Sequence, residues 1–125
     1  MPKIVALFQR NPSLSPEEFR RHYEQSHVPL ILAQGRPFIT GYSRSYLDHS
    51  DPYRIIGGGL AAHGNAPAFD VMTQLEFRDR DAMEGFFRAG REAELAARKR
   101  ADEARFLALD QSMILVSNDV ETSPL

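Results

Sequence analysis

His27 is the residue of this sequence best suited to proton transfer. It lies in the segment YEQSHVPLI, residues 23–31, between a helical pattern and an apolar run. Imidazole has an unperturbed pKa near neutral pH, so it can serve there as an acid or a base. Phe19, Tyr23 and His27 are spaced by four residues and share one helix face, which should turn toward the core. A neutral histidine bonded to a carbonyl or a tyrosine hydroxyl would fit the same pattern, so a structural role stays open beside the chemical one.

Tyr42 and Tyr46 are the next residues whose types could do chemistry. They project from one face of a predicted strand, with Arg44 between them on the same face. Phenol groups in this position can hold a substrate phenol or carbonyl, or donate a hydrogen bond to a developing oxyanion. Sheet packing and a hydrogen bond at a dimer interface would explain the same tyrosines.

The histidines do not form a metal-binding motif. His22, His49 and His63 accompany His27, but the sequence contains no H-x-H, no H-E-x-x-H and no cysteine. His22 and His27 are five residues apart and are expected on different helix faces. No flavin, haem or iron–sulfur motif is present either, so we predict no metal site and no cofactor.

The glycine run at residues 57–59 is not predicted to bind phosphate. No lysine followed by serine or threonine comes after it, and no helix starts where phosphate would need free N–H groups. We expect a loop here, which could act as a lid over a pocket.

The bulk composition limits the classes of partner. The 125 residues are 42% hydrophobic and 26% charged, which fits one globular domain over residues 1–125. The net charge of −2 gives no general attraction to nucleic acid or to an anionic membrane. No stretch approaches the ~20 apolar residues that cross a bilayer, and the first apolar run is too short for a signal peptide. A cytoplasmic protein is expected.

The first part of the chain predicts a strand followed by a helix. Residues 3–10, KIVALFQR, have the apolar and β-branched content of a strand. The sequence SPEE at residues 15–18 is an S-x-x-E capping box with proline at the first helical position. Pro29 disfavours helical backbone at the residue before it, so the helix should end or kink at His27. A further turn could follow before Gly35.

The remainder predicts strand, strand, helix and strand. Residues 39–47 and 68–77 alternate with the period of a strand. A helical pattern begins at Asp79 or Asp81, is interrupted by Gly90 and ends near Phe106. Residues 112–117, SMILVS, form the last strand, and the polar tail over 118–125 should be frayed.

This order of elements predicts an α+β, ferredoxin-like fold. The split βαβ pattern, βαββαβ, gives a four-stranded antiparallel sheet with helices on one face. We expect the other face to expose apolar residues such as Tyr42, Tyr46, Phe69 and Leu75. A second copy of the chain is the simplest cover for them, which predicts a homodimer.

Five short motifs occur in order along nearly the whole chain. They are the opening strand KIVALFQR, LSPEEF at residues 14–19, HVPL at 27–30, FDVMTQLEF at 69–77 and DEARF at 102–106. In this order and spacing the sequence resembles the EthD-like proteins of the dimeric α/β barrel superfamily. The resemblance implies two subunits whose sheets pack face to face, each with a pocket between its sheet and helices.

The resemblance also implies a class of activity. Relatives include cofactor-free enzymes that dehydrate, decarboxylate, cyclise or isomerise aromatic and lactone substrates, and oxygenases that need no metal. It places the histidine of the H-x-P motif, His27, at the pocket. Where many relatives carry a strand histidine and a glutamate, this chain has Tyr46 and Gln74.

We therefore expect a cofactor-independent enzyme, lyase-like or isomerase-like, for an apolar oxygenated substrate of aromatic, polyketide or lactone type. His27 would shuttle a proton while Tyr42 and Tyr46 hold or polarise an oxygen atom. A protein that binds a hydrophobic ligand without chemistry, as an accessory of a degradation pathway, is one alternative, and a cofactor-free oxidoreductase or monooxygenase is another. The expected substrate-binding residues are Phe19, Tyr23, Arg44, Phe69 and Gln74.

Overall fold

Within residues 1–51 and 69–125, which the computed structural model describes, four strands form one antiparallel sheet. Their order across the sheet is β2-β3-β1-β4, and every neighbouring pair is antiparallel. The glycine run at 57–59 and His63 lie outside the described residues. The strands are β1 (Lys3–Phe8), β2 (Ile39–Tyr46), β3 (Val71–Phe77) and β4 (Met113–Ser117).

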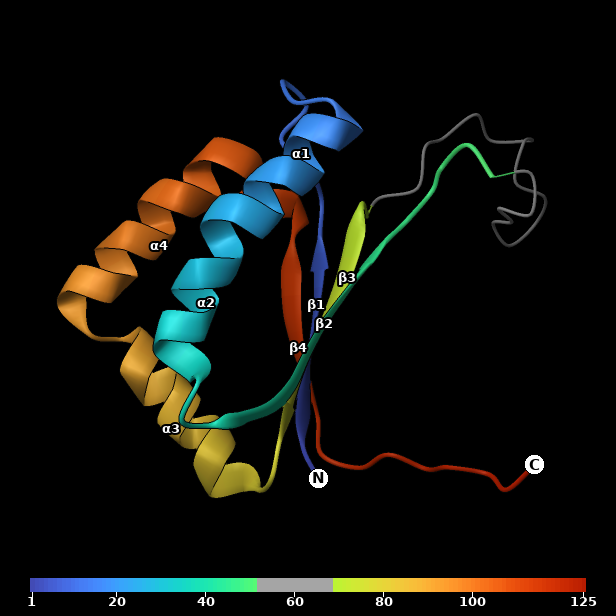
Figure 1. Cartoon of the computed structure of the whole chain (residues 1–125), viewed down its shortest axis with the longest axis vertical. Coiled ribbons are helices and arrows are strands. Elements are labelled where there is room, and N and C mark those ends of the chain that lie inside the picture. The colour runs from blue at the N-terminus through green and yellow to red at the C-terminus, as the bar shows by residue number, and fades with distance from the viewer. Residues whose placement is uncertain (52–68) are drawn as a thin grey trace.

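The helices all lie on one face of the sheet, as Figure 1 shows. Together with the strand order, this confirms the predicted α+β, ferredoxin-like arrangement. A short 3-10 turn, η3 (Leu109–Gln111), leads into the last strand. The helical segments are α1 (Pro16–His22), the π-helical η1 (Tyr23–His27), α2 (Val28–Gly35), α3 (Arg80–Gly90) and α4 (Ala93–Phe106).

The start of α1 is held by the predicted capping box. The Glu18 N–H donates to the Ser15 hydroxyl oxygen at 3.1 Å, and the Ser15 N–H donates to the Glu18 carboxylate at 3.0 Å. Pro16 takes the first helical position, where its missing N–H leaves no bond unmade. This boundary is confirmed.

The first helix does not end at His27; the alternative expectation, an interruption of the regular helix there with a further helical turn before Gly35, agrees with the structure. The helix continues through a single wide turn, η1, in which the Val28 N–H donates to the Tyr23 carbonyl five residues back. Val28 itself is helical, with φ −55° and ψ −46°, although it precedes Pro29. A proline ring inside a regular α-helix clashes with the carbonyl four residues earlier, and the wider turn relieves this clash.

The face of the sheet that meets the helices carries the buried residues of β1 and β3. The paired residues Ile4 and Leu75 lie on it, and Tyr42 is opposite Leu75 on β2. Tyr46, opposite Val71, is on the same side. The prediction that Tyr42, Tyr46 and Leu75 lie on the bare face is therefore wrong, because both faces of the strands carry apolar residues and the pattern alone did not choose between them.

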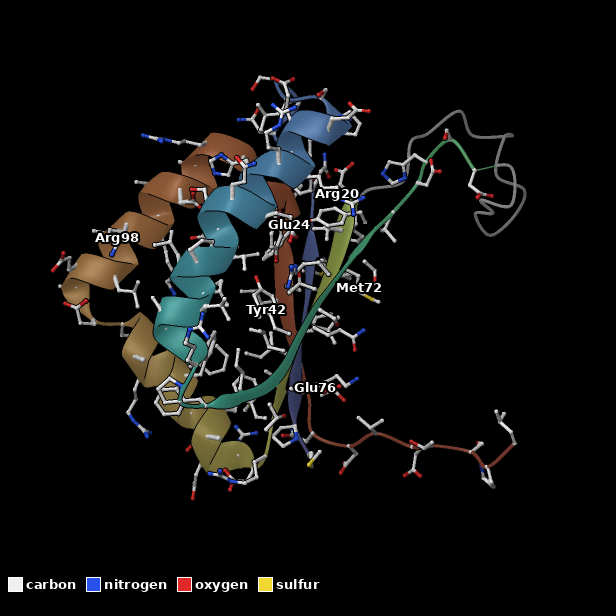
Figure 2. All side chains as sticks on the ribbon, in the orientation of Figure 1. Arg20, Glu24, Tyr42, Met72, Glu76 and Arg98 are labelled. Atoms are coloured by element: carbon white, nitrogen blue, oxygen red, sulfur yellow. The ribbon has the colours of Figure 1, made fainter. Side chains whose placement is uncertain are left out.

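The opposite face is the one without helices. Figure 2 shows Met72 and Glu76 pointing away from the helices and Tyr42 pointing toward them. The register places five apolar side chains on this open face, across three neighbouring strands. They are Val5, Leu7, Met72, Met113 and Leu115.

Two clusters of buried side chains join the helices to the sheet. One gathers around Phe8, Phe19, Tyr23 and Phe106, and the other around Phe77, Met83 and Phe86. No helix in the described part of the chain is long and apolar enough to span a membrane.

Candidate functional site

A cavity of about 110 Å³ lies between the two core clusters, enclosed by the sheet, η1 and the helices α2, α3 and α4. Most of its wall is aliphatic or phenyl. Ile114 of β4 also lines it and is 56% exposed, which marks the side where the cavity meets solvent. The polar groups of the wall are Tyr23, His27, Gln34, Tyr42, Thr73, Lys99 and Glu103.

His27 presents one ring nitrogen to a carboxylate and leaves the other available. Its side chain is buried, and Nδ1 lies 3.0 Å from Oδ2 of Asp102. Because a carboxylate only accepts, Nδ1 carries the proton. Among the described residues Nε2 has no hydrogen-bond partner, and the ring lines the cavity. Burial lowers the pKa of His27 against the opposing effect of Asp102, so the ring is neutral at pH 7 and Nε2 can accept a proton.

Asp102 collects three donors from the first helix. Oδ1 accepts from Nε2 of His22 at 2.8 Å and from the hydroxyl of Ser26 at 2.5 Å, while Oδ2 accepts from His27. Burial alone would raise the pKa of Asp102, but these hydrogen bonds outweigh it and lower that pKa below its ordinary value. The carboxylate is therefore charged, and it fixes the orientation of His27.

The π turn explains how one carboxylate reaches two histidines. The prediction that His22 and His27 lie on different helix faces is wrong, since it assumed α-helical spacing. In η1 the backbone bonds run over five residues, so residues five apart return to the same side. Both rings then meet Asp102 of α4.

Tyr42 and Tyr23 place two phenol groups on the wall of the cavity that His27 also lines. The hydroxyl of Tyr23 shares a 2.5 Å hydrogen bond with that of Thr73. The hydroxyl of Tyr42 is buried and makes no hydrogen bond of normal geometry among the described residues, although it lies close enough to the Tyr23 hydroxyl to interact with it. Burial raises the pKa of both phenols, and for Tyr42 the neighbouring Tyr23 adds to the effect. Tyr42 therefore keeps its proton and can donate it to a ligand oxygen in the cavity.

Tyr46 and Arg44 are committed to a different cluster. The hydroxyl of Tyr46 donates to Oε2 of Glu24 at 2.5 Å, and Arg44 makes two bonds to the same carboxylate at 2.6 and 2.9 Å. The guanidinium of Arg20 lies over the Tyr46 ring, 4.6 Å from its centre. Figure 2 shows Arg20 and Glu24 projecting from the first helix. Neither Tyr46 nor Arg44 lines the cavity.

The structure also places three other predicted ligand-binding residues away from the cavity. Phe19 packs in the core against Phe106, with ring centres 5.7 Å apart. Gln74 lies on the open face of the sheet and accepts a 2.8 Å hydrogen bond from Lys3. Phe69 precedes β3 and is not part of the cavity wall. Of the predicted set, the structure brings together Tyr23, His27 and Tyr42.

Asp102 and Lys99 were missed as site residues. Asp102 lies four residues before the buried Phe106, so it occupies the core-facing stripe of α4, and an acidic residue on such a stripe is the signal that could have identified it. Lys99 belongs to a basic run that fits a solvated face equally well. In the described part of the chain, no group of three or more His, Asp and Glu side chains is arranged to hold a metal ion.

Comparison with known structures supports the fold. An ethyl tert-butyl ether D (EthD) family protein from Bacillus halodurans aligns with a TM-score of 0.61 and 18% identity, over 96% of this chain and 99% of that chain. A dimeric ferredoxin-like protein of unknown function from Thermobifida fusca aligns with a TM-score of 0.54 and 13% identity, over 94% and 89%. A mutant of SnoaB, a cofactor-independent oxygenase from Streptomyces nogalater, aligns with a TM-score of 0.58 and 14% identity, over 99% and 97%.

The sequence itself gives the family. A comparison with curated proteins gave no match, and the identities to the solved structures are low enough that they establish a shared fold alone. Residues 11–110, however, match the EthD domain. This match covers most of the chain, and the protein therefore belongs to the EthD domain family.

Proposed function

We propose that the protein is a cofactor-independent enzyme that moves a proton on a small, apolar, oxygenated molecule held in the cavity. The observation that carries this proposal is the pairing of His27 with Asp102. It leaves a neutral, buried imidazole with a free Nε2 beside a cavity. Asp102 fixes the tautomer and would stabilise the imidazolium that forms when Nε2 takes a proton.

The proton transfer would run between His27 and a carbon or oxygen next to a substrate carbonyl. Nε2 takes the proton while the hydroxyl of Tyr42 donates a hydrogen bond to the carbonyl oxygen, where negative charge develops. Return of the proton to a different atom isomerises the substrate, and its delivery to a leaving hydroxyl dehydrates it. The hydroxyl of Tyr42 supports this role, since a buried donor without a hydrogen bond of normal geometry is costly unless a ligand satisfies it.

The size of the cavity limits the part of a substrate that it can enclose. A volume of about 110 Å³ is somewhat below the ~150 Å³ of an engineered apolar cavity that binds benzene. The cavity would therefore hold about one ring, and a larger substrate would extend past Ile114 toward solvent. The alternative is a protein that binds the ligand and catalyses no reaction, and the test must distinguish it from an enzyme.

We also propose a homodimer joined through the open face of the sheet. The five apolar side chains of this face, Val5 to Leu115, are held by β1, β3 and β4 without a helix over them. A second copy would remove them from water. The likeness to the Thermobifida fusca protein, which is described as dimeric, supports this arrangement.

The test follows exchange of the α-hydrogens of acetophenone, a one-ring ketone, in deuterated buffer by NMR. We expect the protein to accelerate exchange and the substitutions His27→Gln and His27→Ala to reduce this acceleration by about 10²–10⁴-fold. The activity should fall on the acid side with a midpoint below pH 6.5, because burial lowers the pKa of His27. His49→Gln is the matched control, since His49 bonds to Asp70 outside the cavity.

Three results would overturn the proposal. Full exchange activity in folded His27→Gln would remove His27 from the reaction. Loss of the folded state in both His27 variants would assign this residue a structural role. Ligand binding without any acceleration by the wild-type protein would favour the binding-protein alternative.

A further inference from the structure

We propose that the substrate carries a carboxylate, which Lys99 binds at the mouth of the cavity. This inference rests on the proposed function, because it assigns the chemical class of the molecule that the same cavity would hold. It depends on a second group of residues: Gln34, Lys99 and Glu103, which line the cavity, and Gly90 beside them.

The ammonium group of Lys99 is held in place by the side chain of Gln34. Nζ donates to Oε1 of Gln34 at 2.6 Å, and Nε2 of Gln34 donates to the Phe86 carbonyl at 2.9 Å. Gln34 is only 4% exposed, so this carboxamide is a fixed support and not a mobile surface group. Lys99 and Gln34 both line the cavity.

Gly90, the last residue of α3, leaves the space that this pair needs. A Cβ at position 90 would lie 2.5 Å from Nε2 of Gln34 and 2.9 Å from Nζ of Lys99. Such distances are shorter than real contacts between these atoms allow. The end of α3 therefore accommodates the lysine and the carboxamide together.

The charge of Lys99 has no acidic partner in direct contact. No carboxylate lies within 4.0 Å of Nζ in the described part of the chain, and residues 52–68 contain no Asp or Glu. Lys99 is half-buried, and burial lowers its pKa. Glu103 attracts this charge without touching it, and the only hydrogen bond of the ammonium group in the described residues is to a neutral amide. A partly desolvated cation in this position can still bind an anion from outside.

Glu103, one turn further along α4, faces the same cavity. Burial raises its pKa, and Lys99 opposes that rise. A bound carboxylate would be attracted by Lys99 and repelled by an ionised Glu103. The two residues should therefore have opposite effects on the affinity for an anion. Removing Lys99 should weaken an anionic ligand, and neutralising Glu103 should strengthen it.

The positions of the two groups suit one molecule of the predicted size. Lys99 is near enough to His27 for its charge to lower the pKa of that imidazole. A one-ring or short-chain carboxylic acid could therefore place its carboxylate at Lys99 and its reacting atom near Nε2 of His27. Aromatic acids and keto acids with one ring are the substrate class that these contacts select.

The experiment compares benzoate with benzamide, which has the same ring and no charge. Binding to the full-length protein at pH 7 is measured from the NMR signals of the His27 ring. We expect benzoate to bind about tenfold or more tightly than benzamide. Lys99→Met should abolish this preference, Lys99→Arg should keep it, and Glu103→Gln should tighten benzoate several-fold without affecting benzamide.

Arg98→Met is the control for a general loss of positive charge. Arg98 precedes Lys99 on α4 (Figure 2) but is exposed and does not line the cavity, so its substitution should leave the preference unchanged. Equal affinities for benzoate and benzamide, or an unchanged preference in Lys99→Met, would overturn the carboxylate assignment. The proton-transfer proposal would survive that result, because its test uses a neutral ketone. If neither probe moved the His27 signals, the cavity would not be a ligand site.

Discussion

At the hydroxyl of Tyr42, one substitution can distinguish an effect on stability from an effect on activity. This hydroxyl is buried without a hydrogen bond of normal geometry among the described residues and has only a weaker interaction with the Tyr23 hydroxyl, so removing it costs the folded chain little hydrogen bonding. We expect Tyr42→Phe to leave the free energy of unfolding unchanged or to raise it by up to about 1 kcal/mol. The same substitution should reduce α-hydrogen exchange by about 10²-fold, because it removes a donor to the developing oxyanion.

Tyr23→Phe is the matched comparison for Tyr42→Phe. It leaves the buried hydroxyl of Thr73 without its 2.5 Å partner and should lower the free energy of unfolding by about 1–3 kcal/mol. Urea denaturation and the exchange assay on both variants check the prediction. A large loss of stability in Tyr42→Phe would mean that this hydroxyl is structural.

Part of the site could be predicted from single residues. The spacing of Phe19, Tyr23 and His27 identified a stripe that is indeed buried, and His27 faces the cavity. The partner of His27 could not be found in this way. Asp102 is 75 residues further along the chain, and only the packing of α4 against the first helix joins them. The sequence also could not show which of the two tyrosines of β2 belongs to the site. Their positions along the strand determine this, since Tyr42 lines the cavity and Tyr46 bonds to Glu24.

At the scale of elements, the order of strands and helices was predictable and the path of the first helix was not. Local signals, such as the capping box before Pro16 and the alternation of β3, mark boundaries because they act over a few residues. Pro29 also acts locally, and it suggested either an end or a kink of the helix at His27 without deciding between them. Tyr23 and His27 before Pro29, and Leu30 after it, are all buried, and a continuous helix allows this burial. The wide turn η1 lets the helix continue past the proline.

The π turn provides an element-scale prediction. Deleting the exposed Gln25 should convert η1 into a regular α-helical turn and rotate α1 relative to α2 by ~100°. Phe19 and Leu30 could then not both remain buried, and His22 would leave Asp102. We expect the free energy of unfolding to fall by at least about 2 kcal/mol. Deletion of Asp119 in the exposed tail is the control, and equal stability of the two deletions in urea would contradict this account.

At the scale of the whole molecule, both faces of the sheet are apolar and only one is covered by helices. Which face would be covered could not be read from alternation alone, because Leu75 and Met72, on opposite sides of β3, are both apolar. In the structure the helices cover the face that carries Leu75 (Figure 1). They leave an apolar stripe from Met72 through Val5 and Leu7 to Leu115.

This stripe gives a prediction for the assembly. Leu115 and Val116 are neighbours on β4 with similar exposure, 49% and 45%, but they point to opposite faces. Leu115→Lys should shift the sedimentation coefficient from dimer to monomer at micromolar concentration, because it would bury a charge in the interface. Val116→Lys on the helix side should leave the dimer intact. A monomeric wild-type protein, or a dimeric Leu115→Lys, would contradict the proposed interface.

The sequence separation of 75 residues between His27 and Asp102 has a consequence for folding during synthesis. The imidazole is synthesised early, yet the carboxylate that orients it belongs to the last helix, after three of the four described strands. A growing chain on the ribosome would carry the histidine unoriented until α4 has emerged, since a domain of this kind folds as a unit. If His27 is the general base that we propose, a shortened product that stops before α4 would lack the carboxylate that orients it, and the exchange activity would report that translation had passed this helix.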